Sequence, residues 1–129
     1  MSYLIDTDLI IDGLHAVASA LALLEDLAPS GLAVSILSLG ELYEGAYHTP
    51  DPESHRQGVD LFLHGYRLVG LDQSTMVRFA RERAELRRQG LMIPDFDLLI
   101  AATALTHQLT LVTRNTRHFQ RIPDLQIHQ

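Results

Sequence analysis

Short apolar runs alternate with segments of helical periodicity along the whole chain, and this alternation narrows the choice of fold more than anything else in the sequence. We expect strands at residues 3–5, 32–36, 67–71 and 109–113, and a last edge strand at 125–128. We expect helices at residues 15–27, 38–47, 53–66, 72–89 and 95–107. Because parallel strands need crossover helices to join them, the pattern predicts a three-layer α/β/α domain with a central, mostly parallel sheet.

Several of the expected helix ends carry residues that often mark such ends. Asp72 is predicted to cap the N-terminus of the long helix, and Gly90 to end it. Asp95 is predicted to cap the next helix. Ser38 is predicted to open an earlier helix, where Ser38 and Glu41 match the S-x-x-E capping box.

Length and composition point to an ordinary globular chain. Its 129 residues fit one domain, which we expect to span residues 1–129, and its apolar content of 47% is unlike that of a disordered chain. No apolar run reaches the roughly 18–20 residues that cross a bilayer, and no basic segment precedes the first apolar stretch, so we expect no membrane span and no secretory signal. The lack of cysteine excludes disulfides and thiolate chemistry and favours a cytoplasmic location.

Acidic and amide side chains follow the predicted strands. Asp6 comes directly after the first strand, and Glu41 lies in the first turn of the helix after the second. Asp95 and Asp97 begin a late helix, and Asn115 follows the strand at 109–113. Because ligands of open α/β sheets bind beyond the carboxyl ends of the strands, we expect these side chains to converge on one rim.

A group of carboxylates on one rim calls for a cation, because carboxylates packed together repel one another. Hard oxygen ligands without histidine or cysteine suit Mg²⁺ or Mn²⁺ rather than zinc. Such an ion polarises phosphoryl oxygens and neutralises developing charge, so the expected chemistry is hydrolysis of a phosphodiester. The formal net charge of −6 means that nucleic acid would be bound through metal ions and a local patch rather than through a global positive field.

Each acid also has a structural interpretation. Glu41 would only satisfy a helix N-terminus if the capping box forms, and Asp95 suits a cap better than a ligand. Asp97 would favour the positive end of a helix dipole. Asp6 is the hardest to explain in this way, because an acid that closes an apolar strand at the sheet rim rarely has a purely structural role.

The order of these motifs resembles that of the PIN-domain ribonucleases, and within them the VapC toxins of bacterial toxin–antitoxin pairs. The similar segments are YLIDTDLII (3–11), SILSLGELYEGA (35–46), IPDFDLLIAATAL (93–105), and LVTRNTRHF with IPDL (111–119 and 122–125). The third is the most specific, because Asp97 stands two residues before LIAA. Nearly the whole chain takes part in the resemblance.

The resemblance implies a PIN-like fold and a metal-dependent endoribonuclease toxin. It implies that Asp6, Glu41 and Asp97 are the catalytic acids and the ligands of Mg²⁺ or Mn²⁺. It also implies supporting or substrate-contacting roles for Thr7, Asp95, Thr113 and Asn115. By the same resemblance, the partners would be an RNA substrate, an inhibitory VapB-like antitoxin and a second copy of the chain.

One feature departs from the family pattern. Many PIN nucleases carry a fourth acid in the closing segment, whereas this chain has Asn115 and His118 at the candidate places. An asparagine oxygen can still ligate an ion or orient water, so we predict one firm metal site and leave a second ion open.

All ten basic residues are arginine. Those on the helix at 72–89 are expected to form a salt-bridged face, because Glu82 and Glu85 lie four residues after Arg78 and Arg81. Arg114 directly follows a strand at the proposed rim, so we predict that it contacts phosphate. The seven histidines show no paired metal-binding spacing and are expected at the surface or at helix ends.

Two other functions stay open at this point. Asp6 and Asp8 form a D-x-D pair after an apolar strand, which resembles the haloacid-dehalogenase-like phosphatases, and the size and acidic pocket also resemble receiver domains. Both families use a lysine near the phosphoryl group, and this chain has none. The other alternative is a non-catalytic PIN module that binds RNA or a protein, suggested by Asn115.

Overall fold

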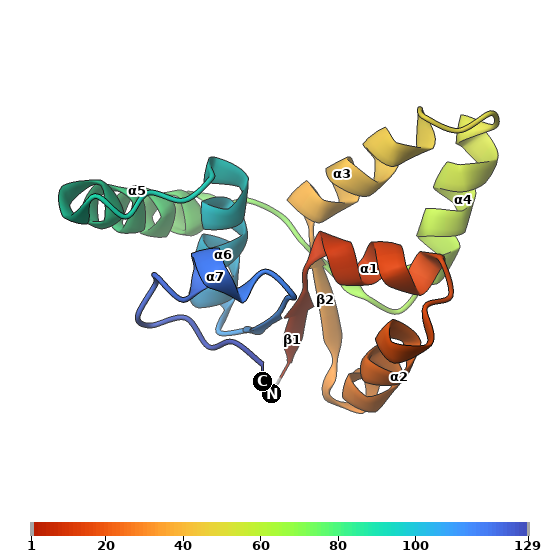
Figure 1. The fold of residues 1–129 in the computed structure, drawn as a ribbon, viewed down its shortest axis with the longest axis horizontal. Helices are drawn as coiled ribbons and strands as arrows, with labels where there is room; N and C mark the ends of the chain where they lie inside the picture. The colour runs from red at the N-terminus through yellow and green to blue at the C-terminus, as the bar shows by residue number, and fades with distance from the viewer. Residues whose placement is uncertain (1, 129) are drawn as a thin grey trace.

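The computed structural model describes residues 2–128 and contains a four-stranded sheet with the order β3-β2-β1-β4 (Figure 1). The strands are β1 (Tyr3–Ile5), β2 (Leu32–Ser35), β3 (Arg67–Val69) and β4 (Thr110–Val112). Each strand pairs in parallel with its neighbours, which confirms the predicted sheet. The predicted edge strand at residues 125–128 is wrong. This segment follows a turn and meets β4 over a single residue pair, the isolated bridge between Leu111 and Ile127.

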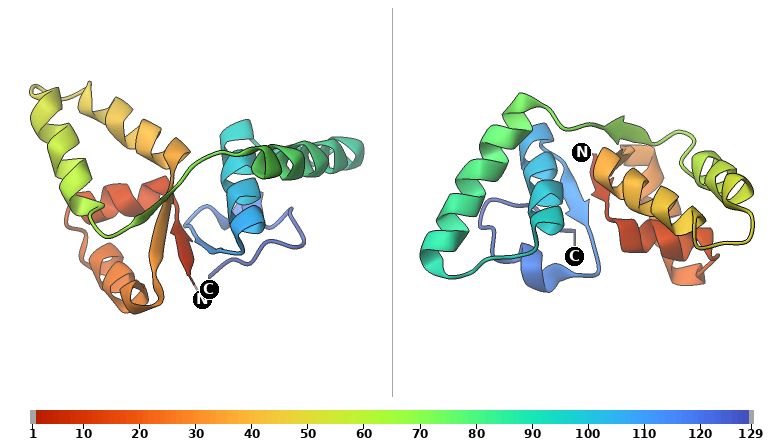
Figure 2. Two further views of the ribbon diagram at one scale, coloured as in Figure 1. Left: turned by 180° about the vertical axis from the view of Figure 1, so that it is seen from behind. Right: turned by 90° about the horizontal axis from the view of Figure 1, so that it is seen from above.

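Helices cover both faces of this sheet. They are α1 (Thr7–Leu14), α2 (Ala18–Leu27), α3 (Ile36–Ala46), α4 (Pro52–Phe62), α5 (Gln73–Gln89), α6 (Asp95–His107) and α7 (Thr116–Phe119), with a 3-10 turn at Ala28–Ser30. Helices α1 to α4 lie on one side of the strands and α5 to α7 on the other (Figures 1 and 2). The three-layer α/β/α prediction is therefore confirmed.

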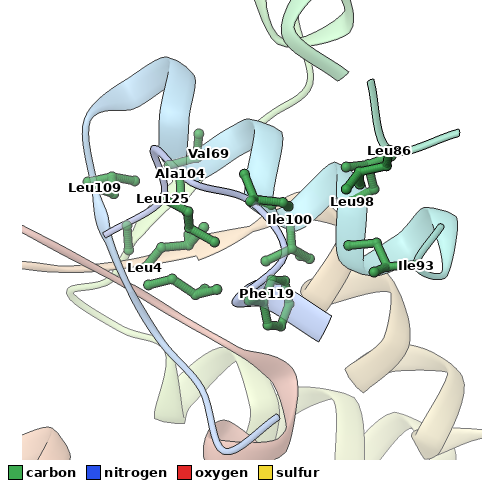
Figure 3. Close-up of a cluster of buried hydrophobic side chains, with 14 residues drawn as sticks. Leu4, Val69, Leu86, Ile93, Leu98, Ile100, Ala104, Leu109, Phe119 and Leu125 are labelled. Atoms are coloured by element: carbon green, nitrogen blue, oxygen red, sulfur yellow. The ribbon is translucent and has the colours of Figure 1, made fainter. Parts of the chain in front are cut away.

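The alternation of side chains along each strand divides the core in two. Leu4 and Leu111 belong to the cluster packed beneath α6, whereas the neighbouring Ile5 and Val112 belong to the cluster beneath α1 to α4. Figure 3 shows the first cluster, in which Phe119 of the short helix α7 lies among the core side chains. Burial of a side chain of this size stabilises the fold by about 1.5–3 kcal/mol, so both faces contribute to stability.

The predicted ends of the long helix α5 are confirmed. Asp72 caps its N-terminus, where Oδ1 accepts a hydrogen bond from Thr75 N at 2.8 Å. Gly90 ends it with a φ of +71°, a left-handed conformation that glycine adopts without steric cost.

The predicted starts of two other helices are wrong. Helix α3 begins at Ile36, and its cap is Ser35, whose Oγ accepts from Leu37 N at 3.0 Å. The helix follows β2 without a loop, so Ser38 lies inside it and Glu41 falls beyond the first turn. The capping-box interpretation of Glu41 is therefore excluded. Asp95 is the first residue of α6 rather than its cap, which is Pro94.

The first helix was not predicted at all. Asp6 ends β1 and caps α1 in one step, so no loop or turn residue separates the two elements. The predicted helix at 15–27 starts later, at Ala18. Within residues 2–128, no single helix is long and apolar enough to cross a membrane, and one pair of helices, Thr7–Leu14 and Ala18–Ser30, passes the same test only as a segment bent by 116°.

Candidate functional site

The order of the strands places three polar residues at one edge of the sheet. Asp6, Ser35 and Thr113 end or follow the adjacent strands β1, β2 and β4. The chain runs outward from β1 to β2 and β3, and later returns to place β4 on the other side of β1. This reversal marks the place where open α/β sheets bind their ligands.

Asp6 is half buried at this edge, and both of its oxygens accept hydrogen bonds. Oδ1 accepts from Thr7 N at 2.9 Å, and Oδ2 accepts from the Thr113 hydroxyl at 2.7 Å. Burial raises the pKa of Asp6 above its ordinary value of 3.8, and the charges of Asp8 and Asp97 add to the rise, while the two hydrogen bonds oppose it. The carboxylate is thus oriented by β4 and α1 and placed among other acids.

Glu41 reaches the same edge from α3. Thr7 Oγ1 lies 2.7 Å from Glu41 Oε1 and 2.8 Å from Ser38 Oγ. A hydroxyl has one proton, so Thr7 donates to the carboxylate and accepts from Ser38. Partial burial raises the pKa of Glu41, and the negative charges of Asp6, Asp8 and Asp97 raise it further.

Asp97 lies in the first turn of α6 and contacts a residue that the sequence did not mark as functional. Its Oδ2 accepts from His118 Nδ1 at 2.8 Å. Asn115 Nδ2 lies 3.2 Å from the same ring nitrogen, and Asn115 N donates to Thr113 Oγ1 at 3.0 Å. A protonated Nδ1 satisfies the carboxylate but cannot accept from Asn115, so the contact with Asp97 is the stronger one.

His118 was expected at the surface or at a helix end, and only its place in the closing motif hinted at more. Its contact with Asp97 depends on how α7 packs against α6, which no local pattern reveals. Thr113 and Asn115, by contrast, lie beside Asp6 and His118 as their positions after β4 suggested.

The donor chemistry of the site fits a divalent cation. Asp6 and Glu41 both feel the negative charge of Asp97, so the three acids share one electrostatic neighbourhood. Carboxylate oxygens are the ligands that Mg²⁺ and Mn²⁺ prefer. Among residues 2–128, however, no three His, Asp or Glu side chains stand together as a ready-made metal-binding group.

Two other predicted site residues are engaged in ion pairs. Asp95 is exposed, and its Oδ1 accepts from Arg83 Nε of α5 at 3.0 Å. Arg114 is half exposed, and it pairs with Asp12 Oδ2 of α1 at 2.5 Å while it reaches toward Ser19 of α2. Each of these side chains would exchange a protein partner for any contact with substrate.

Three of the arginines of α5, Arg78, Arg83 and Arg88, pair with acids, as expected of a salt-bridged face. Arg78 contacts Glu82 at 3.0 Å, which is the predicted pair. Glu85 pairs with Arg88, one turn later, rather than with the expected Arg81.

A family profile described as PIN domain matches residues 3–125. Ribonuclease VapC2 of Rickettsia felis is 32% identical over 127 residues, which cover 97% of this chain and 95% of that protein. The tRNA(fMet)-specific endonuclease VapC of Salmonella typhimurium is 32% identical over 102 residues, which cover 79% of this chain and 77% of that protein.

Solved structures show the same fold. VapBC2 from Rickettsia felis, bound to a DNA fragment from its promoter, matches with a TM-score of 0.91 and 31% identity over 99% of this chain and 98% of that one. VapBC-1 from nontypeable Haemophilus influenzae matches with a TM-score of 0.89 and 28% identity over 100% of this chain and 98% of that one.

Proposed function

Because this chain belongs to the PIN-domain family and to its VapC ribonucleases, we propose that it hydrolyses RNA phosphodiester bonds with Asp6, Glu41, Asp97 and a bound Mg²⁺ or Mn²⁺ ion. The observation that supports the proposal most is a continuous set of hydrogen bonds that joins Glu41, Asp6 and Asp97 through Thr7, Thr113, Asn115 and His118. The negative charges of the three acids also repel one another. Such mutual repulsion is relieved by a cation.

In this proposal, each residue has a stated task. Asp6 and Asp97 hold the ion, and Thr7 and Thr113 keep the Asp6 carboxylate in one orientation. When bound, the ion polarises the phosphoryl oxygens and neutralises the charge that develops on them. Glu41 is the most exposed of the three acids, and Thr7 occupies its Oε1. Its Oε2 is therefore the atom we assign to orienting the attacking water and accepting its proton.

We further propose the partners that the relatives suggest. The structural relatives named VapBC are toxin–antitoxin complexes, so we infer that a VapB-like antitoxin inhibits this chain and that two copies of the chain associate. We also infer one domain over residues 1–129 that works in the cytoplasm.

Cleavage of RNA by the purified chain tests the proposal. We expect Mg²⁺ or Mn²⁺ to support cleavage and EDTA to stop it. Asp6→Asn and Asp97→Asn should each reduce the rate by at least about 100-fold, because each removes a charged ligand. Asp26→Asn, at an exposed acid of α2, is the matched control and should cut like the unmodified chain.

Two observations favour a second candidate, a PIN module that binds RNA without cutting it. Asp97 is already bonded to His118, and residues 2–128 contain no ready-made metal centre. If the chain binds RNA but does not cleave it with any divalent ion, this candidate is supported and the ribonuclease proposal is contradicted.

A further inference from the structure

A cavity of about 290 Å³ lies between α1, α3 and α4 and borders the acids at Glu41. Figure 1 shows these three helices around one corner of the molecule. Part of the wall is apolar, from Ile11 and Leu14 of α1 and Leu42 of α3. Three histidines, His15, His48 and His55, supply much of the polar lining.

One atom of this lining lacks a partner. His55 Nδ1 is buried, and it makes no hydrogen bond within the described part of the chain. A buried polar atom without a partner costs stability. This nitrogen is closed to solvent, so the His55 ring has to turn before Nδ1 can meet a hydrogen-bonding group in the cavity that the residue lines.

Glu41 connects the cavity to the proposed site of cleavage. It lines the cavity, and it also shares the Thr7 hydroxyl network with the neighbourhood of Asp6. A substrate whose phosphodiester lies at the acids therefore has an adjacent group within reach of the cavity.

We propose that the cavity binds one nucleobase of the RNA, adjacent to the phosphodiester that is cleaved. This inference rests on the proposed ribonuclease function and adds to it a subsite that selects the base. Histidine rings stack on unpaired bases and hydrogen-bond to their edges, which is how single-stranded RNA is commonly read. The apolar wall suits the faces of a flat ring.

The charges around the cavity favour a base over other parts of the RNA. Glu41 lies on its wall, and Glu44 bonds His48 at its rim at 2.8 Å. These carboxylates repel a phosphate group but not a neutral base. The base therefore enters, while the anionic backbone stays outside near the acids and their ion.

Substitution of a glycine that lines the cavity is a way to fill it. Gly45 lines it, and a Cβ added there meets nothing within 4 Å. The Cβ of a leucine at position 45 is therefore free of clashes, and we expect the rest of the side chain to occupy the cavity that Gly45 lines. Gly58→Leu in α4 is the matched control, because a Cβ at Gly58 also meets nothing and Gly58 does not line the cavity. Both changes replace a helical glycine, so their effects on helix stability are similar.

Binding of the four ribonucleoside 5′-monophosphates tests the subsite directly. In the presence of EDTA, with detection by NMR, we expect at least one nucleotide to shift the His55 ring signals. Gly45→Leu should weaken that binding about 10-fold, while Gly58→Leu leaves it unchanged. His55→Phe keeps a ring but removes the nitrogens, so it should reduce the preference among the four bases.

Several results would overturn the subsite. Equal nucleotide binding by the unmodified chain and Gly45→Leu would do so, as would no binding at all. If N-acetyl-arginine amide shifts the His55 signals and the nucleotides do not, the cavity takes a basic side chain of a protein partner and the nucleobase assignment is wrong.

The cut sites in a random RNA pool provide a second readout. We expect Gly45→Leu to flatten the base preference next to the cut, with Gly58→Leu unchanged. The two proposals fail separately, because an unmodified chain that binds nucleotides in EDTA but never cuts RNA contradicts only the ribonuclease. A chain that cuts with the same base preference in both variants contradicts only the subsite.

Discussion

The buried Thr113 hydroxyl joins the end of β4 to the end of β1 through a carboxylate. It donates to Asp6 Oδ2 at 2.7 Å and accepts from Asn115 N. Thr113→Val keeps the shape but leaves that carboxylate oxygen without its donor. We expect RNA cleavage or Mn²⁺ affinity to fall about 10–100-fold, which is typical when a residue supporting a metal ligand is lost. Kinetic assays with Mn²⁺ titrations measure both.

The control for this change is another buried threonine. Thr103 donates to Leu99 O within its own helix, away from the acids. Thr103→Val loses one hydrogen bond but no contact with the site, so its cleavage rate should stay near that of the unmodified chain. Equal losses in the two variants would show that Thr113 matters only for folding.

The raised pKa of Asp6 gives stability a definite dependence on pH. Burial makes the folded state bind the proton more tightly than the unfolded state, in which the pKa stays near 3.8. Stability therefore falls as the pH rises from 3.8 through the raised pKa, and the loss is complete above it.

Asp6→Asn removes this titration, so the difference in stability between the variant and the unmodified chain should reveal it. In EDTA, the melting temperature of Asp6→Asn should exceed that of the unmodified chain at about pH 7, with a gap that shrinks toward about pH 4. For a chain of this size, each kcal/mol added to the free energy of unfolding raises the melting temperature by about 4 °C. Scanning calorimetry across this range is the measurement, and a gap that is absent or independent of pH would contradict the assignment.

At the scale of elements, the start of α3 shows how a strand passes directly into a helix. Ser35 is fully buried, ends β2 and caps the helix through Leu37 N. Ser35→Ala should lower the free energy of unfolding by about 1 kcal/mol through loss of the cap. Urea unfolding measures it. Ser54→Ala, at an exposed serine of α4, should change it by much less.

Local sequence patterns predicted most of the helices and strands. They missed the helix that no turn residue separates from the strand before it. The alternation of apolar runs and helical segments was enough for the layers and the parallel sheet. Helix α1 was missed because Asp6 serves both the strand before it and the helix after it. The edge strand at 125–128 was overpredicted because an apolar segment does not reveal how many residues pair.

The candidate site was predictable to the extent that it follows from strand ends. Asp6 and Thr113 follow adjacent parallel strands, so their approach is a consequence of the sheet. The bond between His118 and Asp97 and the pairing of Asp95 with Arg83 depend on the packing of one helix against another. Such contacts are set by tertiary structure and leave no periodic signal.

For the whole molecule, a cation at the acids would link the two helical layers. Glu41 comes from α3 on one face of the sheet, and Asp97 from α6 on the other. We expect Mn²⁺ to raise the melting temperature, with a stabilisation of about 2.7 kcal/mol when the free ion is at 100 times its Kd. Asp97→Asn should lose most of this shift and Asp26→Asn should keep it. An equal shift in all three proteins would place the ion elsewhere.

Phe119 is fully buried in the core beneath α6 (Figure 3). In the same short segment, His118 bonds Asp97 and Asn115 bonds His118. The residue that anchors this segment in the core is thus a different one from the two whose side chains lie at the site. We therefore expect an acid, an amide or an imidazole at positions 115 and 118 to leave the packing of Phe119 intact. Substitutions at these two positions would then alter the contacts with Asp97 while the core that holds the segment stays the same.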